Sequence, residues 1–233
     1  MRKTAKKASP VNIPNILTIF RLIAAPAVGL VYAFLPSPIG DWIALSLFIA
    51  AALTDYLDGY LARKWNQITN LGRMLDPIAD KAMVLIALTV IAVRSQYVSQ
   101  SASADILPAV VLIIFREVLV SGLREFLGDK ASVLKVTALA KWKTTLQMAA
   151  VVVILSSFLL GHYYWAYSWG MDNEIVLGIL AGDLEDIYGL RWIVPAFDWA
   201  STGGVWLLWV AAAVTLVTGF DYFRKALPLL KEI

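Results

Sequence analysis

The chain has 233 residues, of which 60% are hydrophobic and 16% are charged, with a mean hydropathy of +0.72 and a formal net charge of +3. Soluble domains are near half apolar and a quarter charged, so this composition excludes a water-soluble globular protein with a polar surface. Cysteine is absent, which excludes disulfides and thiolate metal sites, and the basic residues form no stripe typical of a nucleic-acid-binding protein.

Six windows of the sequence are apolar and long enough to cross a bilayer, since a spanning helix needs about 20 mostly apolar residues. They predict an all-α polytopic membrane protein with six transmembrane helices. The windows lie at about 13–35, 41–62, 76–94, 105–127, 136–161 and 203–223. Residues 1–12 are then an N-terminal segment, 13–233 form one six-helix domain, and an outer loop covers about 162–202. Its many aromatic residues predict that this loop lies at the depth of the lipid headgroups.

Basic residues cluster in four of the connecting and terminal segments. They are Arg2, Lys3, Lys6 and Lys7, then Arg63, Lys64 and Arg73, then Lys130 and Lys135, and finally Arg224, Lys225 and Lys231. All four segments fall on one side of the membrane if the spans alternate in direction. The positive-inside rule makes that side cytoplasmic, so both termini are predicted to lie in the cytoplasm.

The first predicted span carries three polar residues at a spacing of three, namely Asn15, Thr18 and Arg21. This spacing places them along one face of a helix. They can line a polar cavity, although small polar residues also serve the packing of membrane helices against one another.

Four aspartates lie where the second predicted span ends and the third begins. Asp55 and Asp58 are three apart and Asp76 and Asp80 four apart, so each pair projects from one face of its own helix. A rise of about 1.5 Å per residue from an outer end near Asp41 brings Asp55 close to the cytoplasmic end of the second span, where the third begins. Ionisable groups at membrane depth are costly and mark function. The sequence therefore predicts a cytoplasm-facing pocket of carboxylates.

Carboxylates that lie close together repel one another unless cations intervene. Oxygen-only ligands suit hard ions such as Mg²⁺ or Mn²⁺, and a pair of such ions would also bind a pyrophosphate and stabilise a departing phosphate. Gly59 would let a ligand approach the helix backbone, and Arg63 can hold phosphate oxygens. Two alternatives stay open. The aspartates can cap helices or pair with nearby basic residues, or they can relay ions in a transporter.

The segment DYLDGYLARKWNQITNLGRMLDPIAD, residues 55–80, resembles the signature of the CDP-alcohol phosphatidyltransferase family. The matching positions are Asp55, Asp58, Gly59, Ala62, Arg63, Gly72, Asp76 and Asp80. The resemblance implies six transmembrane helices, a homodimer, a CDP-linked lipid substrate and two divalent cations, Mg²⁺ or Mn²⁺. It also implies a binding site for the CDP moiety, formed by Gly59, Ala62 and Arg63.

The same resemblance implies distinct roles for the four aspartates. Asp55, Asp58 and Asp76 would be the principal metal ligands. Asp80 would complete the metal site and act as the general base near the hydroxyl of the acceptor alcohol.

Further stretches resemble the bacterial phosphatidylglycerophosphate synthases within that family. They are Pro14–Thr18 with Arg21, then Arg116, Glu117, Ser121 and Leu123–Glu125, then Lys141–Thr145 with Gln147, and Asp221 with Tyr222. Together they favour sn-glycerol 3-phosphate as the acceptor and CDP-diacylglycerol as the donor, in a bacterial inner membrane with the active site facing the cytoplasm. The alternative within the family is another acceptor, such as inositol phosphate, serine or phosphatidylglycerol.

Cations near the cytoplasmic ends of the fourth and fifth spans point the same way. Arg116, Arg124, Lys141 and Lys143 can receive a phosphorylated alcohol, and Glu117 can orient Arg124 along one helical face. The alternative for Arg124 and the two lysines is that they anchor the helices by extending toward the interface. Arg116 lies about two turns deeper than Arg124, where a cation without a partner is expensive.

Overall fold

The structure is a computed structural model that describes the backbone of residues 12–65, 69–98, 100–128 and 138–230. Within these ranges the side chains of residues 56, 58–63, 96–104, 138–141 and 229–230 lie outside the description. All regular secondary structure in the described residues is helical, which confirms the predicted all-α class.

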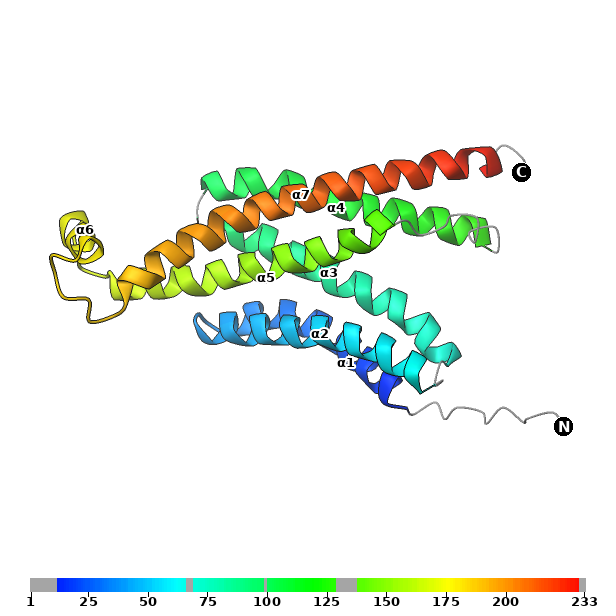
Figure 1. Cartoon of the computed structure of the whole chain (residues 1–233), viewed down its shortest axis with the longest axis horizontal. Helices are drawn as coiled ribbons and strands as arrows, with labels where there is room; N and C mark the ends of the chain where they lie inside the picture. The colour runs from blue at the N-terminus through cyan, green and yellow to red at the C-terminus, as the bar shows by residue number, and fades with distance from the viewer. Residues whose placement is uncertain (1–11, 66–68, 99, 129–137, 231–233) are drawn as a thin grey trace. The chain divides into compact units, whose positions relative to one another are not determined.

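Seven helices follow one another along the described chain (Figure 1). They are α1 (Ile13–Phe34), α2 (Ile39–Lys64), α3 (Asn70–Val98), α4 (Gln100–Leu127), α5 (Ala138–Tyr167), α6 (Asn173–Ala181) and α7 (Leu190–Leu230). Helix α1 begins as a capped helix should, because the Asn12 side chain accepts a hydrogen bond of 2.9 Å from the Asn15 backbone N–H, and Pro14 occupies the first turn.

Four of these helices are long and apolar enough to cross a membrane: Ile13–Phe34, Asp105–Leu127, Trp142–Tyr167 and Leu190–Pro228. Only 28% to 44% of their most apolar windows is buried within the protein, so most of this apolar surface is left for lipid. The protein is therefore a polytopic all-α membrane protein. The count of six spans stays a prediction, since α2 and α3 are not among the four and part of each lies outside the described side chains.

The chain divides into two compact units at Ala87 and Leu88. The first contains α1, α2 and the first part of α3. Small and apolar side chains repeat along the buried faces, as with Ala44, Phe48 and Ala51 on α2 and with Ala24 and Val28 on α1. Alanines at these positions let the two backbones approach closely, as in other membrane helix pairs. The polar site described below lies on the same faces, one or two turns further along.

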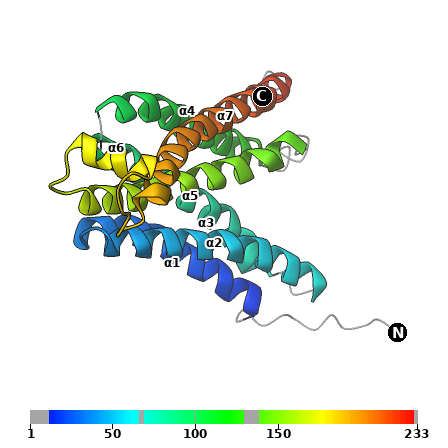
Figure 2. The ribbon, with the colours of Figure 1, turned by 60° about the vertical axis from the view of Figure 1, so that its left-hand side comes forward.

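In the second unit, α5 and α7 run side by side, and α4 packs against α7 (Figures 1 and 2). Glycines let α5 and α7 approach closely. A Cβ atom added at Gly204 would meet Cγ1 of Ile154 at 2.7 Å, and one added at Gly161 would meet a ring carbon of Phe197 at 2.9 Å. Close helix contact at small residues is the usual packing in a lipid environment.

Helical structure extends well into the segment predicted as an outer loop at about 162–202. Helix α5 continues to Tyr167 and α7 begins at Leu190, with α6 between them. Hydropathy windows locate the part of a helix that lies in hydrocarbon, and α5 and α7 extend beyond that part. The exposed Trp169 and Trp192 agree with a position at the headgroups, which stays a prediction.

Hydrogen bonds give this outer segment a defined shape. The Arg191 guanidinium donates to the backbone oxygens of Ile179 (2.7 Å) and Leu184 (2.8 Å), which ties α6 to the start of α7. Asp186 accepts from the backbone N–H groups of Arg191 (2.9 Å) and Leu190 (2.7 Å). These backbone donors, first that of Arg191, hold the pKa of Asp186 below its ordinary value.

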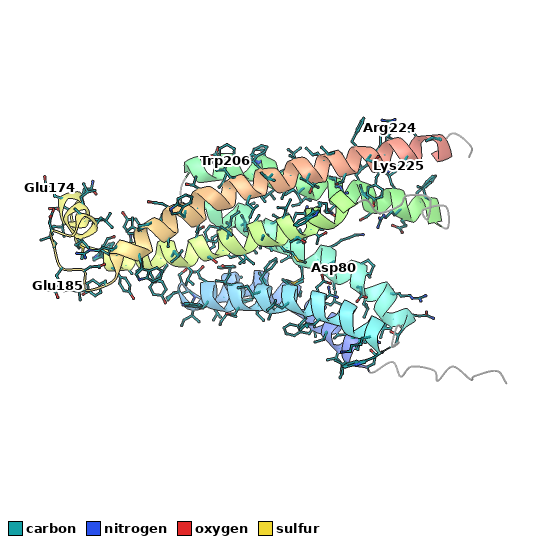
Figure 3. The ribbon with its side chains drawn as sticks, viewed as in Figure 1. Asp80, Glu174, Glu185, Trp206, Arg224 and Lys225 are labelled. Carbon is teal, nitrogen blue, oxygen red and sulfur yellow. The ribbon has the colours of Figure 1, made fainter. Side chains whose placement is uncertain are left out.

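The predicted topology can be tested on two exposed residues at opposite ends of the second unit, Glu174 on α6 and Arg224 on α7 (Figure 3). The natural chain has no cysteine, so a single introduced cysteine is the only thiol. We expect an impermeant thiol reagent to label Glu174→Cys but not Arg224→Cys in cells whose inner membrane is intact, with equal labelling after detergent lysis. Labelling of Arg224→Cys alone before lysis would reverse the topology.

Candidate active site

Polar side chains on one buried face of α1 line a polar site in the first unit. Asn15, Thr18 and Arg21 are 1% to 3% exposed and continue the stripe that buries Ala24 and Val28. The spacing of three to four residues that predicted a common face therefore also puts these side chains against α2 and α3.

Three of the four predicted aspartates converge on Arg21. Its guanidinium forms ion pairs with Asp55 from α2 and with Asp80 from α3, and it lies 3.5 Å from Asp76. The Thr18 hydroxyl donates a hydrogen bond of 2.7 Å to the Asp76 carboxylate. Figure 3 labels Asp80 on α3. Asp55 continues the buried stripe of α2, and Asp76 and Asp80 follow that of α3, so the helix faces aim all three carboxylates at α1.

The charges in this cluster do not balance. One guanidinium neutralises one of three carboxylates, which leaves an excess of negative charge. Arg21 has a side chain that is only 2% exposed, whereas those of Asp55, Asp76 and Asp80 are 35%, 47% and 39% exposed. The arginine therefore lies behind the carboxylates, and part of each carboxylate is open to a ligand.

The chemistry of this donor set suits a hard divalent cation, because all its donors are carboxylate oxygens with unbalanced charge. Within the described part of the chain, no three acidic side chains are gathered closely enough to hold one ion. The side chain of Asp58, the fourth predicted ligand, lies outside that part. The assignment of Asp55, Asp58, Asp76 and Asp80 as metal ligands therefore stays a prediction.

Gly72, one of the signature positions, has a clear steric role. A Cβ atom at this position would lie 2.9 Å from Oδ1 of Asn15, closer than real Cβ atoms come. The same Asn15 oxygen accepts a hydrogen bond of 2.8 Å from the Thr69 hydroxyl, which in turn accepts one of 3.0 Å from the Gly72 backbone N–H. A side chain at residue 72 would therefore push the start of α3 away from α1.

We expect Gly72→Ala to lower the stability of the purified protein by about 1–3 kcal/mol, because the added methyl group overpacks this junction. Thermal unfolding in detergent measures the effect. Gly122→Ala in α4 is the matched control, since an added Cβ there meets nothing within 4 Å and alanine is the better helix former. Equal midpoints for Gly72→Ala and the natural protein would contradict this role.

A second polar cluster lies in the second unit, where α4 meets α5 and α7. Glu117 pairs with Arg116 (3.1 Å) and with Lys143, and all three are at most 9% exposed. Arg116 also donates to the Thr218 hydroxyl (3.1 Å), and Arg124 donates to the Tyr222 hydroxyl (3.0 Å). The described charges sum to an excess of positive charge, as a site for an anion requires.

The prediction that Glu117 orients Arg124 is wrong. Glu117 binds Arg116 and Lys143, while Arg124 binds Tyr222. Positions 117 and 124 are two helical turns apart, about 10 Å along the axis, which is too far for direct contact. A buried carboxylate needs close cations, and the lysine of α5 supplies one.

Some predicted site residues cannot be placed in this way. The side chains of Asp58, Ala62, Arg63 and Lys141 lie outside the described residues, as does the surface exposure of Gly59. The positions of their backbones are known: Asp58, Gly59, Ala62 and Arg63 belong to α2, and Lys141 belongs to α5. Their predicted roles in binding metal and the CDP moiety stay predictions.

Other residues of the two clusters were not predicted from the sequence. Thr69 donates a hydrogen bond to Asn15 and Thr218 accepts one from Arg116, yet single threonines carry no recognisable signal. Gly219 is a further case, because a Cβ atom there would meet Cγ of Arg116 at 2.7 Å. The only sequence signal for this contact is that Gly219 lies one turn from Tyr222 in an otherwise apolar helix, where a glycine can make room for a bulky side chain of a neighbouring helix.

Comparison with known proteins gives consistent matches. A sequence profile of the CDP-alcohol phosphatidyltransferase family matches residues 11–180. A protein of Cereibacter sphaeroides is 49% identical over 222 residues, covering 95% of this chain and 98% of the relative. One of Rickettsia bellii is 36% identical, covering 91% and 94%, and one of Escherichia coli is 42% identical, covering 62% and 76%. All three are named CDP-diacylglycerol–glycerol-3-phosphate 3-phosphatidyltransferase.

Proposed function

This chain belongs to the CDP-alcohol phosphatidyltransferase family, and we propose from that membership that it transfers the phosphatidyl group of CDP-diacylglycerol to sn-glycerol 3-phosphate. The products are phosphatidylglycerophosphate and CMP. The observation that carries the proposal is the similarity to relatives of that name over nearly their whole length. The open, negatively charged carboxylate cluster and the positively charged second cluster support it.

Asp80 is the general base in this proposal. The oxygen of the glycerol hydroxyl attacks the phosphorus of the phosphatidyl group, its proton passes to the Asp80 carboxylate, and the bond from that phosphorus to the oxygen of CMP breaks. Arg21 holds Asp80 in place by an ion pair from a buried position. Thr18, which is also buried, holds Asp76 by donating a hydrogen bond of 2.7 Å to its carboxylate.

Asp55, Asp58, Asp76 and Asp80 would hold two divalent cations, Mg²⁺ or Mn²⁺. When bound, such ions neutralise the charge of a pyrophosphate and of the departing phosphate. The chain itself supplies carboxylate oxygens held at a fixed place by Arg21 and Thr18. Gly59, Ala62 and Arg63 are proposed to contact the CDP moiety, with Asn15, Thr18 and Arg21 lining the site from α1.

The phosphate of the acceptor is assigned to the second cluster. Arg116, Arg124, Lys141 and Lys143 provide cations for a dianion, and an arginine can bind two phosphate oxygens at once. The geometry of Arg116 supports this role, because its guanidinium is held at two points, by Glu117 and Thr218. We further propose a homodimer in the bacterial inner membrane with the carboxylates on the cytoplasmic side.

Release of CMP tests the proposed reaction. Purified protein is given CDP-diacylglycerol, Mg²⁺ and one acceptor at a time: glycerol 3-phosphate, inositol phosphate, serine or phosphatidylglycerol. We expect CMP and phosphatidylglycerophosphate with the first acceptor only, and no CMP after chelation of the metal. CMP release with serine but none with glycerol 3-phosphate would overturn the acceptor assignment.

A further inference from the structure

A cavity of about 530 Å³ lies in the second unit, apart from both polar clusters. It is formed by the beginning of α4 and one stretch of α7, which run beside each other, and Trp206 is labelled there in Figure 3. The lining residues are Asp105, Ser201, Thr202, Val205, Trp206 and Trp209. Its volume is within the range of small-molecule sites, about 300–1,000 Å³.

The depth of the cavity follows from α4. Asp105 precedes Arg124 by 19 positions in one continuous helix, which corresponds to about 28 Å at 1.5 Å per residue. The hydrocarbon core of a bilayer is about 30 Å thick. In the proposed topology Arg124 lies at the cytoplasmic end of this helix, so Asp105 lies near the opposite boundary of the membrane. The cavity therefore lies at the headgroups of the outer leaflet, where tryptophans are common.

The chemistry of the lining selects the charge of a ligand. It offers one carboxylate, two hydroxyls and two indole rings, and none of these lining residues is basic. The Trp209 ring N–H donates to the Asp105 backbone oxygen (2.9 Å), so this ring is fixed against the first part of α4. Trp206 is 70% exposed. A carboxylate and indole rings that line one cavity are the combination that attracts ammonium groups, through charge and through the faces of the rings.

We propose that this cavity binds the ammonium headgroup of a zwitterionic phospholipid of the outer leaflet, of the ethanolamine or choline type. Asp105 pairs with the ammonium, Trp206 and Trp209 contact its methylene or methyl groups, and the apolar surface of α7 continues along the acyl chains. A lipid with a net negative charge finds no cation among the described lining residues and is repelled by Asp105. The site is independent of the proposed reaction.

Short-chain lipids provide a direct test with the full-length protein in a non-ionic detergent. Calorimetric titration with diheptanoyl phosphatidylethanolamine, phosphatidylcholine and phosphatidylglycerol compares the three headgroups. We expect saturable binding of an ammonium lipid, at least tenfold tighter than binding of the glycerol lipid. Asp105→Asn and Trp206→Leu should each weaken it about tenfold.

Two variants outside the cavity serve as matched controls. Trp169→Leu removes a tryptophan that is also 70% exposed, and Glu185→Gln removes an exposed outer acid. Both should bind the ammonium lipid like the natural protein. If Trp206→Leu fails to fold, Asp105→Asn, which alters only the exposed carboxylate, decides the question alone.

Three results would overturn the proposal. The first is equal affinity for ammonium and glycerol headgroups, and the second is unchanged binding by Asp105→Asn. The third is a shift in oligomeric state with Trp206→Leu, measured by light scattering, without loss of lipid binding. That result would mean that a second copy of the chain covers the cavity.

Discussion

We expect Asp80→Asn to lower turnover by about 10²- to 10⁴-fold, while the affinity for CDP-diacylglycerol stays nearly the same. The amide keeps the shape of the side chain and one oxygen for a ligand, but it cannot accept the proton of the glycerol hydroxyl. Single-turnover CMP release measures the chemical step. Direct titration of a CDP-lipid into the protein, at a series of Mg²⁺ concentrations, measures binding.

Asp55→Asn is the comparison variant, because Asp55 is proposed as a metal ligand but not as the base. Like Asp80→Asn, this variant removes one negative charge next to Arg21. Unlike Asp80→Asn, it should weaken the Mg²⁺-dependent binding of the CDP-lipid as well as turnover. Glu185→Gln, an exposed acid of the outer segment, should change neither quantity. Near-normal turnover in Asp80→Asn would remove that residue from the role of base.

Spacing within each helix was enough to predict which side chains share a face. The intervals of three and four residues put Asn15, Thr18 and Arg21 on one stripe of α1 and both Asp76 and Asp80 on one stripe of α3, and the structure has them so. Composition was enough for the all-α membrane class. Both inferences depend on the geometry of a single helix and on the solvent around it.

Partners across helices could not be predicted in the same way. Spacing does not say how two helices are rotated about their axes, so it could not assign Arg21 to Asp55, Asp76 and Asp80. The pairing of Glu117 with Lys143 could not be predicted for the same reason, since the lysine comes from another helix. The Gly72 contact with Asn15 likewise depends on how closely α3 approaches α1.

The ends of the helices could not be predicted from the sequence either, for a different physical reason. The apolar windows stop where the sequence becomes polar, whereas α5 continues to Tyr167 and α7 begins at Leu190. Backbone hydrogen bonds can continue in water once a long helix has formed, and caps such as Asp186 then decide where it begins. Hydropathy therefore reports the membrane boundary and not the end of the helix.

The cationic cluster of the second unit leads to a prediction about the acceptor. Glycerol 3-phosphate is a dianion near neutral pH, so its binding requires cations in addition to the metal ions that are proposed to hold the pyrophosphate. Arg124 is exposed and is held by Tyr222 through a hydrogen bond of 3.0 Å, with its guanidinium 5.1 Å from the ring centre. Arg116 is buried and held by Glu117 and Thr218. Both guanidinium groups are thus fixed before any anion arrives.

We expect Arg124→Ala to raise the KM for glycerol 3-phosphate roughly ten- to hundredfold, the loss of about 1.5–3 kcal/mol for a charged hydrogen-bonded contact. The KM for CDP-diacylglycerol should change little. Arg116→Ala should have a similar effect on the acceptor, with an added loss of stability because the buried Glu117 loses one of the two cations that pair with it. Because the phosphate lies away from the reacting hydroxyl, kcat should fall less than KM rises.

Two further variants show whether the effect comes from a specific contact. Arg124→Lys keeps the charge but loses the two-pronged geometry, so it should recover only part of the affinity for the acceptor. Arg224→Ala removes an exposed cation of α7 and should leave both KM values unchanged. Steady-state rates over a matrix of both substrate concentrations, on protein checked for a single folded species, give both KM values and kcat. An equal rise of the two KM values in Arg124→Ala would assign the residue to anchoring or folding, because a contact with the acceptor phosphate can favour only one substrate.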